Sequence, residues 1–259
     1  MLSIANPIPA ASIKLIVFDL DGTLIDSRRD LATAVNAMLT EMGRPALPEK
    51  VVAEYVGDGA GMLVRRALGD PEDEHLVDEG VERFLACYKR HMLDHTHVYD
   101  GVFEALEALR VIPSGAEAPL KNGDSVDGLK AVPFKGGAGG GERKFAVLTN
   151  KPVNPSKKIC EALGMTKYFF QIYGGNSFGT KKPDAEGLRA LMSEAGVRAE
   201  ETVMVGDSVV DVLVARNAGT WVIGCLYGLS SHTLETVVSD CTVDAASEWP
   251  LALDAAGKQ

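Results

Sequence analysis

The sequence has little of what marks secreted, redox-active or membrane-spanning proteins. Its four cysteines, at positions 87, 160, 225 and 241, lack the short paired spacing of zinc or redox motifs, so we expect buried, reduced thiols. No apolar run approaches the roughly 20 residues that cross a bilayer. The first basic residue, Lys14, comes too late for the charged start of a signal peptide. These absences predict a cytoplasmic protein that does not use a membrane.

Basic residues are also too few for a nucleic-acid-binding protein. The chain of 259 residues has 26 Lys and Arg against 36 Asp and Glu, a formal net charge of −10. Nucleic-acid binding usually needs a basic face, so we expect no such partner. A small anionic substrate remains compatible with this charge, because nearby lysines and a divalent cation set the local field.

Short apolar segments alternate with helical patterns along most of the chain. The segments that we predict as strands are Leu15–Phe18, Phe145–Leu148, Phe170–Tyr173, Val203–Val205 and Trp221–Ile223. This alternation predicts an α/β fold with a Rossmann-like, doubly wound parallel sheet, formed by residues 13–26 and 98–259. Ligands of such sheets bind beyond the carboxyl ends of the strands. Residues 1–12 are predicted to be a frayed N-terminal tail.

Residues 27–97 differ because their pattern is entirely helical. Ser27 is a candidate cap for a first helix that stops at Gly43, and further helices are expected at about 49–55, 60–68 and 72–93. A separate segment, 111–143, has 8 Gly and 3 Pro in 33 residues and no sustained periodicity. We expect it to be a flexible, solvent-exposed insertion.

The most informative motif follows the first predicted strand. Asp19 and Asp21 leave the strand end in similar directions, because side chains alternate along a strand. One carboxylate can attack phosphorus while the other transfers a proton. Gly22 lets the chain turn and bring its amides close to an anion. This arrangement suits metal-assisted phosphate chemistry.

Polar residues follow two other predicted strands and precede one predicted helix. Thr149 and Asn150 follow the strand that ends at Leu148, and their hydroxyl and amide groups can bind phosphoryl oxygens. Lys182 precedes Pro183, which suits the first turn of a helix that ends at Gly196. Asp207 and Asp211 follow the strand that ends at Val205. They add oxygen ligands of the kind that Mg²⁺ prefers. We expect Lys151 to lie nearby without touching the substrate.

These four motifs, in this order, resemble the haloacid dehalogenase superfamily, specifically its phosphoglycolate phosphatase branch. The resemblance implies that Asp19 is the nucleophile, forming an aspartyl-phosphate, and that Asp21 is the general acid and base. It implies a Mg²⁺ site formed by Asp19, Asp207, the backbone carbonyl of Asp21 and, through water or Lys182, Asp211. Residues 27–97 then correspond to an inserted helical cap domain.

Within the predicted cap, a glycine-bracketed loop precedes a helix. Gly57, Asp58 and Gly59 match the family's substrate-specificity loop in position, and backbone amides there can bind an anion. Arg65, or its neighbour Arg66, is a candidate for binding a substrate carboxylate, because a guanidinium binds carboxylates in a bidentate manner.

The resemblance favours a Mg²⁺-dependent phosphomonoester hydrolase acting on a small phosphorylated metabolite, with 2-phosphoglycolate as the substrate. Phosphosugar phosphatase or mutase and pyrophosphatase activities are the alternatives, and a non-catalytic binding protein on the same fold is a remote one. A dehalogenase is disfavoured, because Asp21 has a role only with a phosphate leaving group. The sequence is compatible with a monomer or a homodimer.

Overall fold

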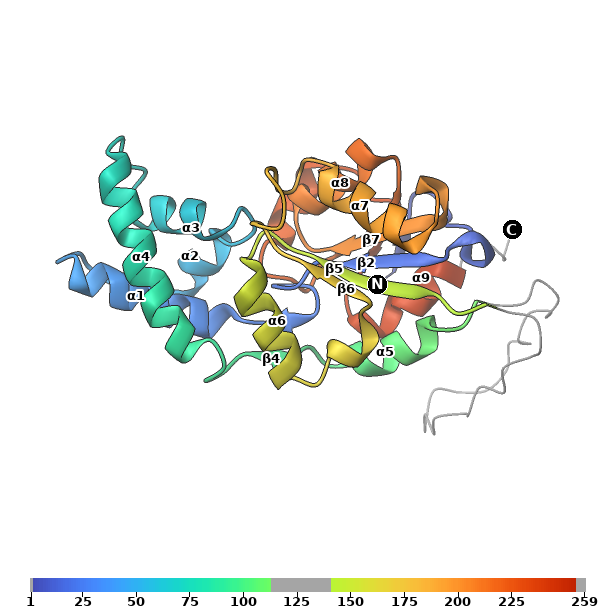
Figure 1. Ribbon diagram of the computed structural model, residues 1–259, viewed down its shortest axis with the longest axis horizontal. Helices are drawn as coiled ribbons and strands as arrows, with labels where there is room; N and C mark the ends of the chain where they lie inside the picture. Colours follow the sequence, from blue (N-terminus) through green and yellow to red (C-terminus); the bar gives the residue numbers. More distant parts are fainter. Residues whose placement is uncertain (1, 113–140, 255–259) are drawn as a thin grey trace.

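The computed structural model describes residues 2–112 and 141–254. Most of the predicted insertion, 111–143, therefore lies outside the described residues. Within them, a seven-stranded sheet has the order β1-β9-β8-β7-β2-β5-β6, in which only β1 is antiparallel to its neighbour. The mainly parallel α/β sheet expected from the alternating pattern is confirmed (Figure 1). No helix in these ranges is both long and apolar enough to cross a membrane.

The sheet is built around β2 (Leu15–Phe18), which pairs in parallel with β5 (Lys144–Leu148) and β7 (Thr202–Gly206). Phe18 lies opposite Val147 of one neighbour and Val205 of the other. This register brings the residues that follow all three strands to one edge of the sheet. The remaining strands are β6 (Gln171–Tyr173), β8 (Trp221–Cys225) and β9 (Cys241–Val243).

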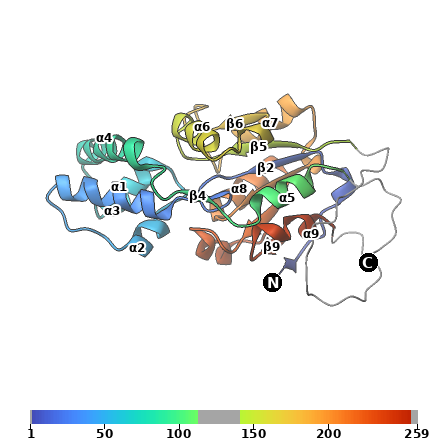
Figure 2. The same ribbon diagram turned by 90° about the horizontal axis from the view of Figure 1, so that it is seen from below.

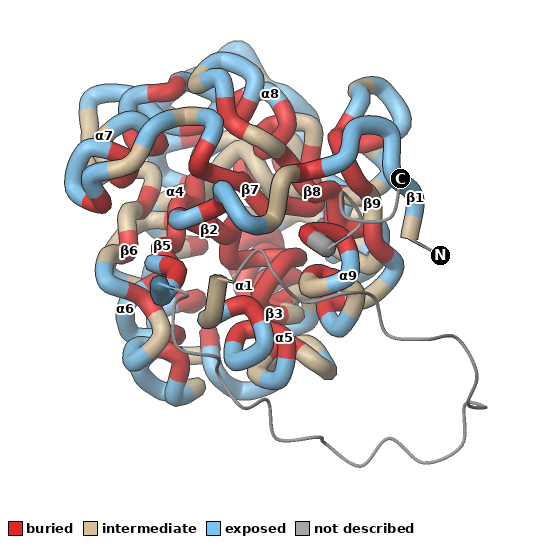
Figure 3. The backbone as a smooth tube through the Cα atoms, turned by 90° about the vertical axis from the view of Figure 1, so that its right-hand side faces the viewer, coloured by how far each residue is buried: buried red, intermediate tan, exposed pale blue. Residues whose placement is uncertain are grey.

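Helices cover both faces of the sheet because β2 is apolar on both sides. Ile16 and Phe18 belong to one buried cluster, which includes residues of α5 (Val102–Leu109), α6 (Val153–Ala162) and α9 (Trp249–Asp254). Leu15 and Val17 belong to a second cluster, with residues of α7 (Glu186–Ala195) and α8 (Val209–Ala218). Figure 3 shows the buried strands enclosed by more exposed helices.

Helices α1 to α4 form a separate four-helix unit beside the sheet (Figures 1 and 2). Their bounds are Arg28–Glu41, Glu49–Glu54, Ala60–Ala67 and Glu74–His91. The chain enters the unit through β3 (Ile25–Asp26) and leaves it through β4 (His97–Val98), which pair as a two-stranded antiparallel ribbon. The two connections therefore support each other at the junction.

The N-terminal segment differs from the frayed tail that we expected. Ser3–Ile4 forms β1 against the outer edge of β9, and Ile8 is fully buried. Arg143 explains part of this order, because its guanidinium donates hydrogen bonds to the carbonyls of Ala10 and Ile13. The same side chain donates to the carbonyls of Leu109 and Val111, so Arg143, the last residue of the predicted insertion, is buried rather than exposed.

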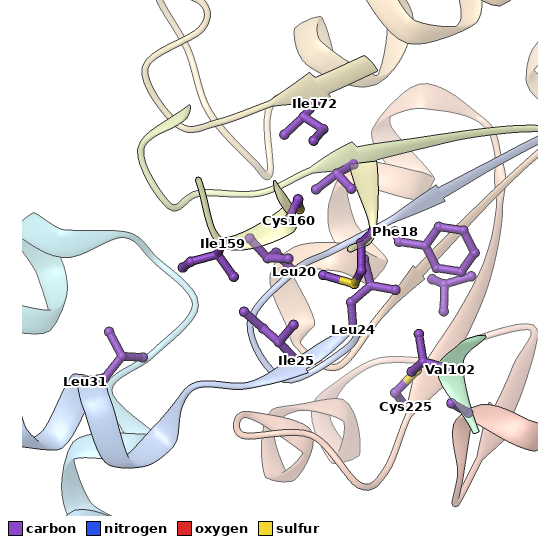
Figure 4. Packing of buried hydrophobic residues seen from close by; sticks show 14 of the residues in the cluster. Phe18, Leu20, Leu24, Ile25, Leu31, Val102, Ile159, Cys160, Ile172 and Cys225 are labelled. Carbon is purple, nitrogen blue, oxygen red and sulfur yellow. The ribbon is translucent and has the colours of Figure 1, made fainter. Parts of the chain in front are cut away.

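All four cysteines lie in the described part of the chain and are buried and free, as predicted. Cys160 and Cys225 pack into the same apolar cluster as Phe18, Leu20 and Leu24 (Figure 4). Burial raises the pKa of both thiols to about 12. They therefore act as small apolar side chains.

Candidate active site

Asp19 and Lys182 form the centre of the site. Asp19 directly follows β2, and its backbone amide donates a hydrogen bond to the carbonyl of Val205 in β7. Lys182 Nζ lies 2.8 Å from Asp19 Oδ1 and 2.7 Å from Asp211 Oδ1, and all three side chains are buried. Burial acts to lower the pKa of Lys182, but the attraction of the two carboxylates raises it, so the ammonium stays charged. Burial raises the pKa of Asp19 to about 6, although Lys182 opposes this.

Two further buried carboxylates converge on this pair. Asp207 follows β7, Asp211 lies in the first turn of α8, and their oxygens lie within 4.8 Å of each other and of Asp19. Burial, followed by the charges of Asp211 and Asp19, raises the pKa of Asp207 well above its usual range. Three carboxylates face one ammonium, which leaves an excess of negative charge. Such a buried cluster of hard oxygen donors fits a divalent cation such as Mg²⁺.

Glycines let the backbone approach these carboxylates closely. A Cβ added to Gly22 would lie 2.2 Å from Asp207 Oδ2, and one added to Gly228 would lie 2.2 Å from the Cβ of Asp207. Gly22 also has a φ of +85°, which other residues rarely adopt. The backbone amide of Ser230 donates to Asp207 Oδ2 over 2.9 Å. Asp207 is therefore fixed by two chain segments far apart in the sequence.

Asp21 is held separately from the acidic cluster. Its carboxylate accepts hydrogen bonds from Lys151 Nζ at 2.9 and 3.0 Å and from Ser27 Oγ at 2.5 Å. We expected Ser27 to cap α1, but its side chain makes no capping bond there, because its hydroxyl is used by Asp21. The α1 backbone is capped instead by Asp26, whose carboxylate accepts from the amide of Arg28.

Thr149 and Asn150 lie at the end of β5, as the pattern predicted. Thr149 Oγ1 accepts a hydrogen bond from the Lys151 amide over 3.2 Å, which leaves its hydroxyl hydrogen available to a ligand. Asn150 Nδ2 donates to the carbonyls of Lys182 and Gly57, each at 3.0 Å. Asn150 therefore joins the sheet edge both to the lysine segment and to the four-helix unit.

The loop Val56–Gly59 contacts the core at several points. Ser230 Oγ donates to the carbonyl of Val56, and Lys181 Nζ donates to that of Asp58, each over 2.7 Å. A Cβ on Gly59 would lie 3.0 Å from the carbonyl oxygen of Asn150. These contacts hold the loop against the edge of the sheet.

A cavity of about 540 Å³, part of it open to solvent, lies between this loop and the sheet edge. Asp19, Asp21, Thr149, Asn150, Lys151, Gly57 and Gly59 line it. The opposite wall consists of apolar and aromatic residues of the four-helix unit, including Leu31, Leu63, Phe84 and Tyr88. The structure thus combines a polar floor, with carboxylates and an ammonium, and a largely apolar roof.

Known proteins support the chemistry that this geometry suggests. The sequence profile of the haloacid dehalogenase-like hydrolases matches residues 16–112 and 141–225. The chain belongs to the haloacid dehalogenase-like hydrolase family. The resemblance inferred from the four motifs is thereby confirmed, and each motif lies at the sheet edge where parallel sheets bind ligands.

Individual relatives of this hydrolase family cover most of the chain. A protein of Chromobacterium violaceum named phosphoglycolate phosphatase is 35% identical over 240 residues, which are 91% of this chain and 94% of that protein. One of the same name from Pseudomonas syringae pv. tomato is 37% identical over 221 residues, covering 83% and 70% of the two chains. A crystal structure described as a predicted phosphoglycolate phosphatase from Haemophilus somnus has a TM-score of 0.73 and 28% identity, covering 92% and 96%.

The arginines that we expected at the hydrolase site do not line its cavity. Arg65 pairs with Glu74 and donates to the carbonyl of Pro71. Arg66 pairs with Asp58 at 2.5 Å and donates to the carbonyl of Tyr55. Both guanidinium groups are therefore used within the four-helix unit. Asp58, which belongs to the predicted specificity loop, likewise does not line the cavity.

Several residues of the site were not expected from the sequence pattern. Lys151 was expected only nearby, yet it binds Asp21 and lines the cavity. Gly228 and Ser230 were not singled out, because a glycine and a serine after a strand are ordinary loop residues. Pro183 lies before α7 rather than in its first turn, since the helix begins at Glu186. Gly196 ends that helix, as predicted, and adopts a left-handed conformation.

Proposed function

We propose that this hydrolase is a Mg²⁺-dependent phosphatase that acts on 2-phosphoglycolate through an aspartyl-phosphate on Asp19. The observation that carries the proposal is the position of the Asp19 carboxylate. It lines the cavity, contacts Lys182 and lies within 4.8 Å of two further carboxylates. A carboxylate can attack a phosphate ester only where positive charge offsets the repulsion between the two anions.

Asp19, Asp207 and Asp211, with the backbone carbonyl of Asp21, would hold the Mg²⁺. The three buried carboxylates have an excess of negative charge, and Asp211 additionally orients Lys182 over 2.7 Å. When bound, the cation would neutralise phosphoryl charge and polarise the phosphorus.

In the first step, an Asp19 carboxylate oxygen forms a bond to phosphorus as the bond from phosphorus to the ester oxygen breaks. Asp21 gives its proton to that oxygen, and glycolate leaves as the alcohol. Lys182 stabilises the charge that Asp19 and the phosphoryl group share, and the hydroxyl of Thr149 donates to a phosphoryl oxygen.

In the second step, water replaces Asp19 on phosphorus. Asp21, now ionised, takes a proton from the water as the oxygen attacks, and the Asp19 carboxylate departs unchanged. Lys151 and Ser27 hold the Asp21 carboxylate in one place, which positions it for both steps.

The four-helix unit would act as the cap that excludes bulk water and selects the leaving group. Its loop contacts Asn150, Lys181 and Ser230 of the core. The substrate assignment is supported by the relatives, which are named phosphoglycolate phosphatase.

The test is phosphate release from 2-phosphoglycolate beside a panel of phosphosugars, pyrophosphate and an aryl phosphate, with and without Mg²⁺. Preference for 2-phosphoglycolate that is lost without Mg²⁺ and in Asp19→Asn would support the proposal. Broad release without preference would contradict the assignment of 2-phosphoglycolate as the substrate but would remain consistent with the proposed phosphatase chemistry. No release from any ester would contradict both.

A further inference from the structure

One cationic side chain faces the cavity. Among the described residues that line it, Lys151 is the single Lys, Arg or His. Lys182 contacts Asp19 and Asp211 and is not part of the lining. An anionic group on the leaving group of a substrate would therefore pair with Lys151.

The surroundings of Lys151 keep its ammonium charged and fixed. Nζ lies 2.9 and 3.0 Å from the oxygens of Asp21, and 4.6 Å from the centre of the Tyr88 ring. An ammonium has three N–H donors, and the two carboxylate oxygens engage at most two of them. At least one donor is thus not engaged by Asp21. Tyr88 belongs to α4, so the four-helix unit itself helps to hold this ammonium in place.

The other side chains of the roof that line the cavity are mostly apolar. Leu31, Leu63 and Phe84 line the cavity with hydrocarbon. An ion pair is stronger in such surroundings than in water, because the local dielectric constant is lower. An uncharged leaving group would leave the Lys151 donor without a partner, which costs binding free energy.

We propose that Lys151 is the specificity-determining residue, which binds the carboxylate of the leaving group. This inference rests on the proposed function. Asp21 must reach the ester oxygen to protonate it, and Lys151 lies within hydrogen-bond distance of Asp21. In 2-phosphoglycolate a single methylene separates the ester oxygen from the carboxylate. The carboxylate therefore comes within reach of Lys151 when the ester oxygen contacts Asp21.

Two substrates of matched size isolate this contact. 2-Hydroxyethyl phosphate has a hydroxymethyl group where 2-phosphoglycolate has the carboxylate. The readout is the ratio of kcat/KM for the two esters in the wild type, Lys151→Met, Lys151→Arg and Arg65→Met. Loss of Lys151 also disturbs Asp21, but this affects both esters, so the ratio reports the carboxylate alone.

We expect the wild type to favour 2-phosphoglycolate by about 100-fold or more, and Lys151→Met to reduce that ratio to near one. Lys151→Arg should retain part of the preference, and Arg65→Met all of it. Remaining turnover of 2-hydroxyethyl phosphate, with an unchanged circular dichroism spectrum, verifies that each variant is folded.

Three results would overturn the inference, and they differ in what they say of the proposed function. A wild-type preference that survives in Lys151→Met would refute the role of Lys151 and leave the substrate assignment intact. A wild type that hydrolyses both esters equally would refute the substrate assignment and the role of Lys151 together. Loss of the preference in Arg65→Met instead would transfer the role to that arginine.

Discussion

The ammonium of Lys182 lies between the carboxylates of Asp19 and Asp211, at 2.8 and 2.7 Å. The three residues come from chain segments more than 20 residues apart, and all are buried. The lysine offsets the charge of the proposed nucleophile, while Asp211 fixes its direction. Ser208 in turn fixes Asp211, donating hydrogen bonds from its backbone amide and hydroxyl at 3.1 and 2.7 Å.

Lys182→Met should reduce kcat by about 10³-fold, because positive charge at the reacting group is a large part of such catalysis. It should also destabilise the protein by about 3 kcal/mol, since two buried carboxylates lose their partner. Lys181→Met is the matched control, because Lys181 Nζ donates to the backbone carbonyl of Asp58, and its loss should cost less than 10-fold. Kinetics and urea unfolding check both. An equal loss in the two variants would contradict the role of Lys182.

Asp207→Asn should raise the Mg²⁺ concentration for half-maximal activity by about 10- to 100-fold, because it removes a charged oxygen ligand. Glu201→Gln is the control, since Glu201 lies at the opposite end of β7 and pairs with Lys14. Mg²⁺ titration of phosphate release, with calorimetry in the absence of substrate, measures the shift. Unchanged Mg²⁺ affinity in Asp207→Asn would contradict the metal site.

Gly228→Ala should displace Asp207, because the new Cβ would lie 2.2 Å from that of Asp207. We expect a loss of about 1 to 3 kcal/mol of stability and weaker Mg²⁺ binding. Gly179→Ala is the control for adding a methyl group to a glycine, since no atom lies within 4 Å of the Cβ position at Gly179. Thermal unfolding and Mg²⁺ titration distinguish the two. Equal behaviour would mean that close packing at Gly228 is unimportant.

The metal-free protein should lose stability as pH rises from about 4 to about 6. The pKa of Asp19 is raised from 3.8 to about 6 by burial, so in this range the folded protein binds more protons than the unfolded chain. The contribution to the free energy of unfolding is therefore full below pH 4 and is lost as pH rises through 6. Mg²⁺ should reverse the trend, because it binds the ionised carboxylates.

The measurement is the Tm between pH 4 and 7, in EDTA and in excess Mg²⁺. Asp19→Asn cannot titrate at this position, so its Tm in EDTA should fall less steeply over the same range. An identical slope in the wild type and Asp19→Asn would show that Asp19 does not titrate in this window.

The parts of the fold that local pattern determines could be predicted from the sequence. The run Leu15–Phe18 is apolar at every position and forms β2 with the predicted bounds. Its register with β5 and β7 explains why Asp19, Thr149 and Asp207 meet, since each follows one of three neighbouring strands. By contrast, β9 has only three residues and lies beside polar ones, and β1 depends on it for pairing.

The parts of the site that depend on distant partners could not be predicted in the same way. Lys151 is 130 positions from Asp21, and nothing in the sequence near it indicates a carboxylate partner. Serine is a common helix-cap residue, but the fold places the Asp21 carboxylate 2.5 Å from the Ser27 hydroxyl. Arg65 has the chemistry to bind a carboxylate, yet Glu74 of the neighbouring helix already pairs with it.

The most direct test of the account is to trap the phosphorylated protein. Asp21→Asn should still be phosphorylated by a ³²P-labelled aryl phosphate, because an aryl leaving group needs no proton, but it cannot activate water. We predict an acid-stable, hydroxylamine-sensitive label that maps to the peptide containing Asp19 and is absent in the double variant with Asp19→Asn. Turnover by Asp19→Asn, or a label on another residue, would contradict the claim that Asp19 is the nucleophile.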